Sequence, residues 1–185
     1  AEVCRRSAQL AHNTARTDST VGTVVIAARG PAYLSGTGFG IDTLRRVVPV
    51  ALADTNAMRQ AFEEGLVRAA ERFHAAGKRV ILVLGVPEMG FLPDECLVGR
   101  PLGLRRIRKP CAISRTAFDR RNAAYRDMVA RIREHAPAIE VFDPTSIFCD
   151  AVLCRATDGQ ALLYSDGNHL ALAGSRRVAA RLLPM

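Results

Sequence analysis

Tryptophan is absent from the 185-residue sequence, and aromatic residues make up only 5% of it. Proteins that bind single-stranded nucleic acid stack bases on aromatic side chains, so this shortage disfavours such a role. The sequence also lacks an apolar stretch of about 18 residues, the length that a membrane-spanning helix needs. Residues 1–6 do not have the pattern of a signal peptide. We therefore predict a soluble domain without a membrane span, whose export, if any, is directed from elsewhere.

Lysine is scarce, because Lys78 and Lys109 are the only two and arginine supplies the other basic residues. The formal net charge of +8 suits nucleic acid, an anionic membrane surface or an acidic polysaccharide. An arginine- and alanine-rich composition is also typical of proteins encoded by GC-rich genomes, so charge alone does not select a partner. With 49% hydrophobic residues, the chain is long enough for one domain, residues 1–185, with a buried core.

The five cysteines lack the spacing of a zinc site. Zinc ligands come in closely spaced pairs such as C-x2-C. Cys96 and Cys111 instead bracket a loop, Cys149 and Cys154 lie five positions apart, and Cys4 is left over. This arrangement favours two local disulfides, with free buried thiols or a metal site as alternatives. Disulfides would indicate an oxidising compartment.

The hydrophobic pattern predicts an α/β domain with a parallel sheet. Two β-branched apolar runs, 23–28 and 79–87, are typical of strands buried on both faces. An amphipathic helix between them, over residues 54–76, makes a right-handed βαβ unit. The remaining predicted elements are a helix at 116–134 that opens with a Thr116/Asp119 capping box, a strand at 139–143 and a helix at 170–183.

Two loops of this predicted fold are candidate functional segments. Ligand-contacting residues in open α/β sheets lie just beyond the carboxyl ends of strands. The turn that contains Arg29, Gly30 and Tyr33 is therefore a candidate wall of a binding site. The alternative is that this turn only ends the strand. The glycines at 36–40 have the wrong spacing for phosphate binding and predict a loosely ordered loop. Segment 88–113 has no periodicity, and a Cys96–Cys111 bridge would stabilise it by about 3 kcal/mol.

The strongest catalytic candidate is the segment 163–170, with the sequence LYSDGNHL. If a helical turn begins near Asp166, the three-residue separation places its carboxylate and the His169 imidazole on one face, with Cβ atoms about 5–6 Å apart. Such a carboxylate orients the ring, whose other nitrogen accepts a proton from a hydroxyl. The alternative is a tight turn in which Asp166 binds backbone amides and His169 is an ordinary surface residue.

Several motifs together resemble the extracytoplasmic SGNH-hydrolase-like domain fused to the C-terminus of acyltransferase-3 membrane proteins, which O-acetylate bacterial surface polysaccharides. The resemblance covers nearly the whole chain, and its most specific part is the segment 163–170. The other matching features are Arg29 and Tyr33 after the first strand, Val86-Pro87-Glu88 after the second, the cysteines at 96, 111, 149 and 154, Val141-Phe142-Asp143-Pro144, Asp158-Gly159 and Ala173-Gly174.

The resemblance implies a flavodoxin-like three-layer α/β/α fold and a Ser-His-Asp mechanism in which Asp166 and His169 are catalytic. The family's Gly-Asp-Ser block is absent; Ser19 follows an aspartate but has no strand or glycine before it. We therefore expect this block upstream of residue 1. The sheet would then lack its first, central strand, and Cys4 would pair with a cysteine further upstream. Gly30 stands where the family commonly has tryptophan, so Arg29, Gly30 and Tyr33 are only loosely proposed as substrate-binding or oxyanion residues.

The function that the resemblance implies is acetyl transfer to a sugar hydroxyl of a surface polysaccharide. Its acetyl donor would be delivered by a fused membrane acyltransferase domain, in a periplasmic or other extracytoplasmic location tethered to the inner membrane. It implies no metal, no soluble cofactor and no nucleic-acid partner. Two alternatives remain at this stage: a carbohydrate acetylesterase of the SGNH class, and a catalytically silent glycan-binding module.

Overall fold

A three-stranded parallel sheet organises the computed structural model, which describes residues 2–42, 55–97 and 109–185. Its strands, in spatial order, are β1 (Thr23–Ala27), β2 (Arg79–Val83) and β4 (Ile139–Phe142). Thr23 pairs with Arg79, and Val80 pairs with Ile139. The parallel α/β architecture predicted from the sequence is thereby confirmed.

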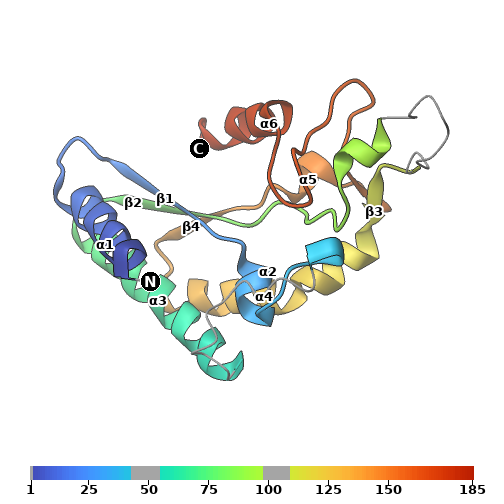
Figure 1. The fold of residues 1–185 in the computed structure, drawn as a ribbon. Helices are drawn as coiled ribbons and strands as arrows, with labels where there is room; N and C mark the ends of the chain where they lie inside the picture. Colours follow the sequence, from blue (N-terminus) through green and yellow to red (C-terminus); the bar gives the residue numbers. More distant parts are fainter. Residues whose placement is uncertain (1, 43–54, 98–108) are drawn as a thin grey trace.

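Helices lie on both sides of this sheet and make three layers (Figure 1). On one side are α1 (Glu2–Thr17), α3 (Thr55–Ala75) and α4 (Arg115–His135), and on the other is α6 (Leu172–Leu182). α3 ends where the sequence predicts, because Gly77 adopts a positive φ of 73° that a residue with a side chain rarely takes. None of the described helices is both long and apolar enough to cross a lipid bilayer.

Two buried clusters hold these layers together. The first lies between the sheet and the helices α3 and α4, and the second lies beyond the carboxyl ends of the strands. At about 25 cal/mol per Å² of apolar surface removed from water, such clusters supply most of the favourable free energy of folding. The central members of the first are Phe73, Leu82, Met128 and Ile132, and those of the second are Phe91, Phe118, Phe148, Leu163 and Tyr164.

Short elements and two disulfides build the end of the molecule around the second cluster. Cys96 is bonded to Cys111 and Cys149 to Cys154, as the cysteine spacing predicted. The basic segment 98–108 and the side chain of Cys4 lie outside the described residues. The short elements are α2 (Gly30–Ser35), η1 (Gly40–Asp42), η2 (Pro93–Cys96), α5 (Thr145–Phe148) and an antiparallel pair, β3 (Ala112–Ser114) with β5 (Leu153–Arg155).

The prediction that β1 is buried on both faces is wrong. β1 is an edge strand that pairs only with β2 among the described residues. Its Val24 and Ile26 pack against the helical layer, whereas Val25, on the other face, is 48% exposed. The apolar composition of a strand shows what it can bury, but burial also requires neighbours on both faces and both edges.

Two local predictions also need correction. Ser114, not Thr116, caps helix α4, since its hydroxyl accepts a hydrogen bond of 3.1 Å from the amide of Ala117. The chain directly after β1 is not open loop but the short helix α2, which Gly36 ends with a φ of 73°. Both differences arise because several adjacent residues can cap or start a helix, and packing selects among them.

Candidate functional site

Loops from three parts of the chain meet beyond the carboxyl ends of β1 and β2. Arg29 follows β1, Glu88 follows β2, and the C-terminal segment 163–170 lies against the residues after Glu88. Glu88 is only 5% exposed, and its two carboxylate oxygens accept hydrogen bonds from Arg29 Nε at 2.5 Å and Arg121 Nε at 2.6 Å. This is the edge at which open parallel sheets place their sites.

The structure brings Asp166 and His169 together, with Asp166 Oδ2 2.7 Å from His169 Nδ1. The contact does not come from a helical turn, as the spacing had suggested. Residues 165–169 form a tight turn closed by the Tyr164–Leu170 bridge, and Asp166 Oδ1 accepts from the backbone amides of Asn168 at 2.8 Å and His169 at 2.7 Å. Both expectations therefore hold at once. Asp166 Oδ1 binds the backbone amides of the tight turn, and Asp166 Oδ2 binds the His169 ring.

The electrostatics of this turn keep Asp166 ionised. Partial burial acts to raise the pKa of its carboxyl group, but the hydrogen bonds from the Asn168 amide and from the His169 ring and amide outweigh burial, and the pKa lies below its usual range. A carboxylate accepting at Nδ1 places the proton on that nitrogen and leaves Nε2 as a proton acceptor. The His169 side chain is 74% exposed, and its Nε2 has no hydrogen-bond partner in the described part of the chain.

Two contacts from outside fix the position of the turn. The backbone amide of Met89 donates to the carbonyl oxygen of Gly167 at 2.7 Å. The side-chain amide of Asn168 donates to Asp42 Oδ2 at 3.0 Å, and the same Asp42 oxygen lies 3.4 Å from Arg29 Nη2. A chain of contacts thus runs from Arg29, at the end of β1, through Asp42 to the side chain of Asn168 in the turn.

The three residues proposed as a site wall have separate positions. Arg29 belongs to the contact network of the turn, and its side chain is 27% exposed. Gly30 is buried under the ring of Tyr125: a Cβ at this position would lie 2.2 Å from a ring carbon, which explains glycine here without a substrate-binding role. Tyr33 stacks on Phe62 of α3, with ring centroids 5.6 Å apart, so α2 directs it toward the helical layer.

Ser19 lies at the opposite end of the sheet from this turn. It precedes β1, beside Asp18, whose backbone carbonyl accepts a hydrogen bond of 2.6 Å from the buried Lys78 at the start of β2. The described residues contain no cluster of histidine, cysteine and acidic side chains arranged to hold a metal ion.

Sequence reasoning missed Asp42, Arg121 and the role of Asn168. Glu88 offered a signal, since it is a lone carboxylate directly after an apolar strand, where parallel sheets collect functional groups. Asp42 lies in a glycine-rich segment and Arg121 in an arginine-rich helix, and neither has a local pattern that separates it from its neighbours.

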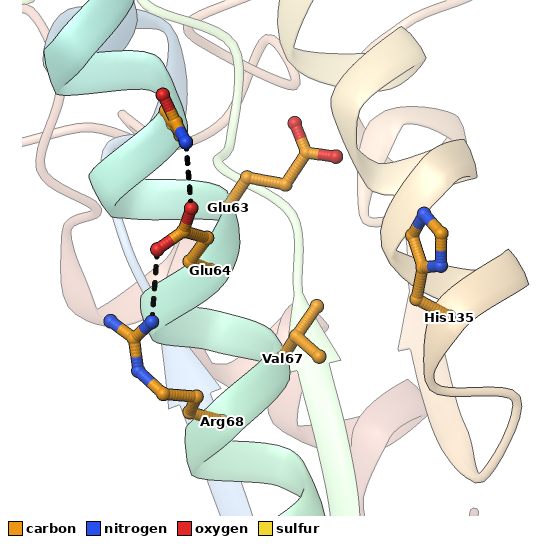
Figure 2. Close-up of a pocket in the computed structure, with 6 residues that line it drawn as sticks. Glu63, Glu64, Val67, Arg68 and His135 are labelled. Carbon is orange, nitrogen blue, oxygen red and sulfur yellow. Dashed lines mark hydrogen bonds and ion pairs between the residues drawn. The ribbon is translucent and has the colours of Figure 1, made fainter.

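A separate cavity of about 530 Å³ lies between α3 and α4 (Figure 2). Its charged side chains are paired: Glu64 accepts from Gln60 at 2.8 Å and from Arg68 at 3.0 Å, while Glu63 forms an ion pair of 2.8 Å with Arg131. His135, which also lines it, is the last residue of α4 and precedes the amino end of β4. The cavity is therefore not part of the site at the carboxyl ends of the strands.

The fold and the turn define an α/β domain with an Asp-His pair at the carboxyl edge of a parallel sheet. The sequence matches the family model described as "SGNH domain (fused to AT3 domains)" over residues 2–184, and the chain belongs to this family. No curated protein matches the sequence.

A solved structure with the same fold is the "Salmonella ser. Paratyphi A lipopolysaccharide acetyltransferase periplasmic domain". It superposes with a TM-score of 0.60 at 14% sequence identity, and the match covers 95% of the present chain. At this identity the likeness concerns the fold. The match covers 60% of that domain, so the chain spans less than two thirds of the neighbour's length.

Proposed function

We propose that this chain supplies the histidine and the aspartate of a Ser-His-Asp O-acetyltransferase that modifies a sugar hydroxyl of a surface polysaccharide. The observation that carries the proposal is the Asp166–His169 contact of 2.7 Å, which leaves the second ring nitrogen of an exposed imidazole free to accept a proton. Membership of a domain family described as fused to AT3 domains supports acyl transfer as the reaction class.

In the proposed reaction, His169 Nε2 accepts the proton of a serine hydroxyl, and the serine oxygen attacks the acetyl carbonyl carbon of the donor. The bond from that carbon to the leaving group breaks, and His169 gives the proton to the leaving group. An acceptor hydroxyl then loses its proton to His169 and attacks the acetyl-serine ester, and the released serine oxygen regains that proton. Asp166 stabilises the imidazolium that forms in each half of the reaction.

We further propose that residues 1–185 form a single SGNH-like unit that lacks the nucleophile block. The serine would then come from a segment outside these residues. The edge of β1 that has no neighbouring strand among the described residues supports this location. Neighbouring strands lie about 4.8 Å apart, so an added parallel strand on β1 would end beside Arg29, at the same edge of the sheet as the turn. The solved neighbour is also longer than the present chain.

Arg29 is the proposed substrate or oxyanion contact at this edge. Its Nε and Nη2 contact Glu88 and Asp42, while Nη1 has no hydrogen-bond partner among the described residues. A fixed guanidinium with free N–H groups is suited to stabilise a developing oxyanion. Gly30 would contribute only its backbone. Tyr33 stacks on Phe62 of α3, so it would contact a glycan only at the helical layer.

The proposed location is extracytoplasmic, with the acetyl donor delivered by a fused membrane domain. Two disulfides support an oxidising compartment. The solved neighbour is described as a periplasmic domain, and the family description names the fusion partner.

The test is His169→Ala in the intact protein, with base-released acetate from the surface polysaccharide and turnover of 4-nitrophenyl acetate as readouts. We expect both to fall by about 10³-fold or more. His135→Ala, which removes an exposed histidine at the other end of the fold, is the matched control and should leave both unchanged. Undiminished acetylation in a folded His169→Ala protein would remove His169 from the reaction.

An acetylesterase is the second candidate, because an imidazole that is 74% exposed is open to water as well as to a sugar. Adding acceptor polysaccharide to the assay separates the two activities. Transfer predicts acetylated polysaccharide at the expense of free acetate, whereas an esterase releases acetate at the same rate with or without acceptor. Glycan binding without turnover of either substrate would identify a silent binding module.

A further inference from the structure

The turn at residues 165–169 is closed by its own hydrogen bonds, and two contacts from elsewhere hold it against the rest of the fold. One of these, Met89 N to Gly167 O, is a backbone contact that most substitutions leave intact. The other joins two side chains that lie 126 positions apart in the sequence, Asn168 and Asp42. Asn168 also presents its backbone amide to Asp166 Oδ1 at 2.8 Å, so a shift of Asn168 moves a donor that orients the catalytic carboxylate.

Asp42 is itself rigidly placed. It ends the short helix η1, whose Ile41 amide donates to the carbonyl oxygen of Gly90 at 3.1 Å. Gly40, with a φ of 60°, packs so closely on Gly90 that a Cβ would lie 2.1 Å from its carbonyl oxygen. The backbone that carries Asp42 is therefore pressed onto the same loop, after β2, whose Met89 binds the turn.

A partly buried ion-pair network, centred on the buried Glu88, holds the cation beside Asp42. Arg29 Nη2 lies 3.4 Å from the Asp42 carboxylate, and Arg29 Nε is bound to the buried Glu88. Glu88 also holds Arg121, which in turn donates to the hydroxyl of Ser35 at 2.9 Å and to a backbone oxygen beyond it. Arg29 is therefore held beside Asp42, because Glu88 after β2, Arg121 of α4 and Ser35 of α2 are linked in one network.

We propose that Asp42 is a positioning residue for the Asp166–His169 pair, which it orients through the side chain of Asn168. This inference rests on the proposed function for the reaction that the pair performs. Asp42 does not contact the imidazole, so it acts on the pair through Asn168 and the geometry of proton transfer. A displacement of a reacting group by about 1 Å is enough to lower a rate by as much as 10²-fold.

The test compares Asp42→Ala with Asp42→Asn in the intact protein, with 4-nitrophenyl acetate as substrate. Asp42→Ala removes the acceptor for Asn168, and we expect kcat to fall by about tenfold with KM changed by less than about twofold. Asp42→Asn keeps a side-chain oxygen in the same place and should recover most of kcat. A residue with a purely structural role would instead lower the amount of folded protein without changing the kcat of what remains.

Two further measurements decide the route of the effect. Asn168→Ala should also lower kcat, and the double variant should be no worse than Asp42→Ala, because the contact between Asn168 and Asp42 is already absent in Asp42→Ala. The ¹⁵N spectrum of the His169 ring should show a smaller share of the tautomer with the proton on Nδ1 in Asp42→Ala. Glu63→Ala, which breaks the ion pair with Arg131 between α3 and α4, is the matched control and should change neither readout.

An Asp42→Ala protein with wild-type kcat and an unchanged ¹⁵N spectrum would overturn the inference, and so would fully additive losses in the double variant. The ring spectrum does not depend on acetyl transfer. If His169→Ala leaves activity intact, the proposed function fails, while the effect of Asp42 on the tautomer still decides whether Asp42 orients the pair.

Discussion

The turn at residues 165–169 and the cavity between α3 and α4 both gather charged side chains and a histidine, but they differ in what is left unpaired. Around the cavity, each carboxylate has a cationic partner: Glu63 is bound to Arg131. Glu64 is bound to Arg68, as Figure 2 shows. In the turn, the carboxylate of Asp166 is bound to a histidine whose other nitrogen has no partner among the described residues.

The difference teaches that the size of a cavity does not identify the site here. The cavity is large, yet its charges neutralise one another, and pairs this exposed contribute little to stability or chemistry. The turn is exposed, yet it holds an imidazole at the edge of a parallel sheet, where such folds place their sites. The proposed function therefore rests on the imidazole nitrogen that has no partner among the described residues, and not on the volume of a cavity.

The largest expected contrast comes from neutralising one carboxylate in each region. Asp166→Asn keeps the shape of the turn but no longer selects the histidine tautomer with Nε2 free, so acetyl transfer should fall by about 10³- to 10⁴-fold. Glu64→Gln should leave the rate unchanged, because the group lies in the cavity and only loses an exposed pair with Arg68. Steady-state turnover of 4-nitrophenyl acetate checks both, and equal activity of the two variants would break the comparison.

The next contrast concerns two glycines, one in the packed layer and one in the turn. A Cβ on Gly30 would collide with the ring of Tyr125, so Gly30→Ala should destabilise the fold by about 1–3 kcal/mol. A Cβ on Gly167 would lie 3.4 Å from the backbone oxygen of Phe91, an ordinary contact, and Gly167 has no positive φ. Gly167→Ala should therefore change stability by less than about 0.5 kcal/mol. Urea unfolding measures both free energies.

A smaller effect is expected at Tyr164, the buried residue that precedes the turn. Its hydroxyl has no hydrogen-bond partner among the described residues, and burial raises the pKa of this phenol well above its usual value. Removing an unsatisfied buried polar group is neutral or stabilising, so Tyr164→Phe should raise the free energy of unfolding by up to about 1 kcal/mol. Activity should not change, and a loss of stability would reveal a partner for the hydroxyl.

The parts of the structure that the sequence predicted are local in the chain. Helices α3 and α4 follow from a hydrophobic stripe that repeats within each of them, and β2 follows from one short apolar run. The contact between Asp166 and His169 was also predictable, since only three positions separate them. Its mechanism was not, because a helix and a tight turn bring such residues together equally well.

The unpredicted parts depend on residues far apart in the sequence. The exposure of Val25 is set by what lies beside β1, and not by the composition of β1. Asp42 binds Asn168, which lies 126 positions further along the chain, and Glu88 binds Arg121, which lies 33 positions further. No periodic pattern in the sequence predicts either contact. Such contacts become visible only when the fold is known, which is why the side chains that support Asp166 and His169 were missed while the contact between these two residues was predicted.

The smallest expected effect concerns acid stability, where the two regions should agree. Hydrogen bonds lower the pKa of Asp166 against the opposing effect of burial, and hydrogen bonds from Gln60 and Arg68 lower the pKa of Glu64. A carboxyl group with a lowered folded-state pKa adds stability that is fully present above its ordinary pKa, 3.8 for Asp166 and 4.5 for Glu64, and is lost as the pH falls through the folded value.

Asp166→Asn and Glu64→Gln should each slightly flatten the loss of thermal stability between about pH 5 and pH 2. Since Glu64 is exposed and Asp166 is only partly buried, the two slopes should change by similar small amounts, although only Asp166→Asn is expected to lose activity. A steep change confined to Asp166→Asn would mean that the turn stabilises the fold as well as orienting His169, and its loss of activity would then have to be separated from unfolding.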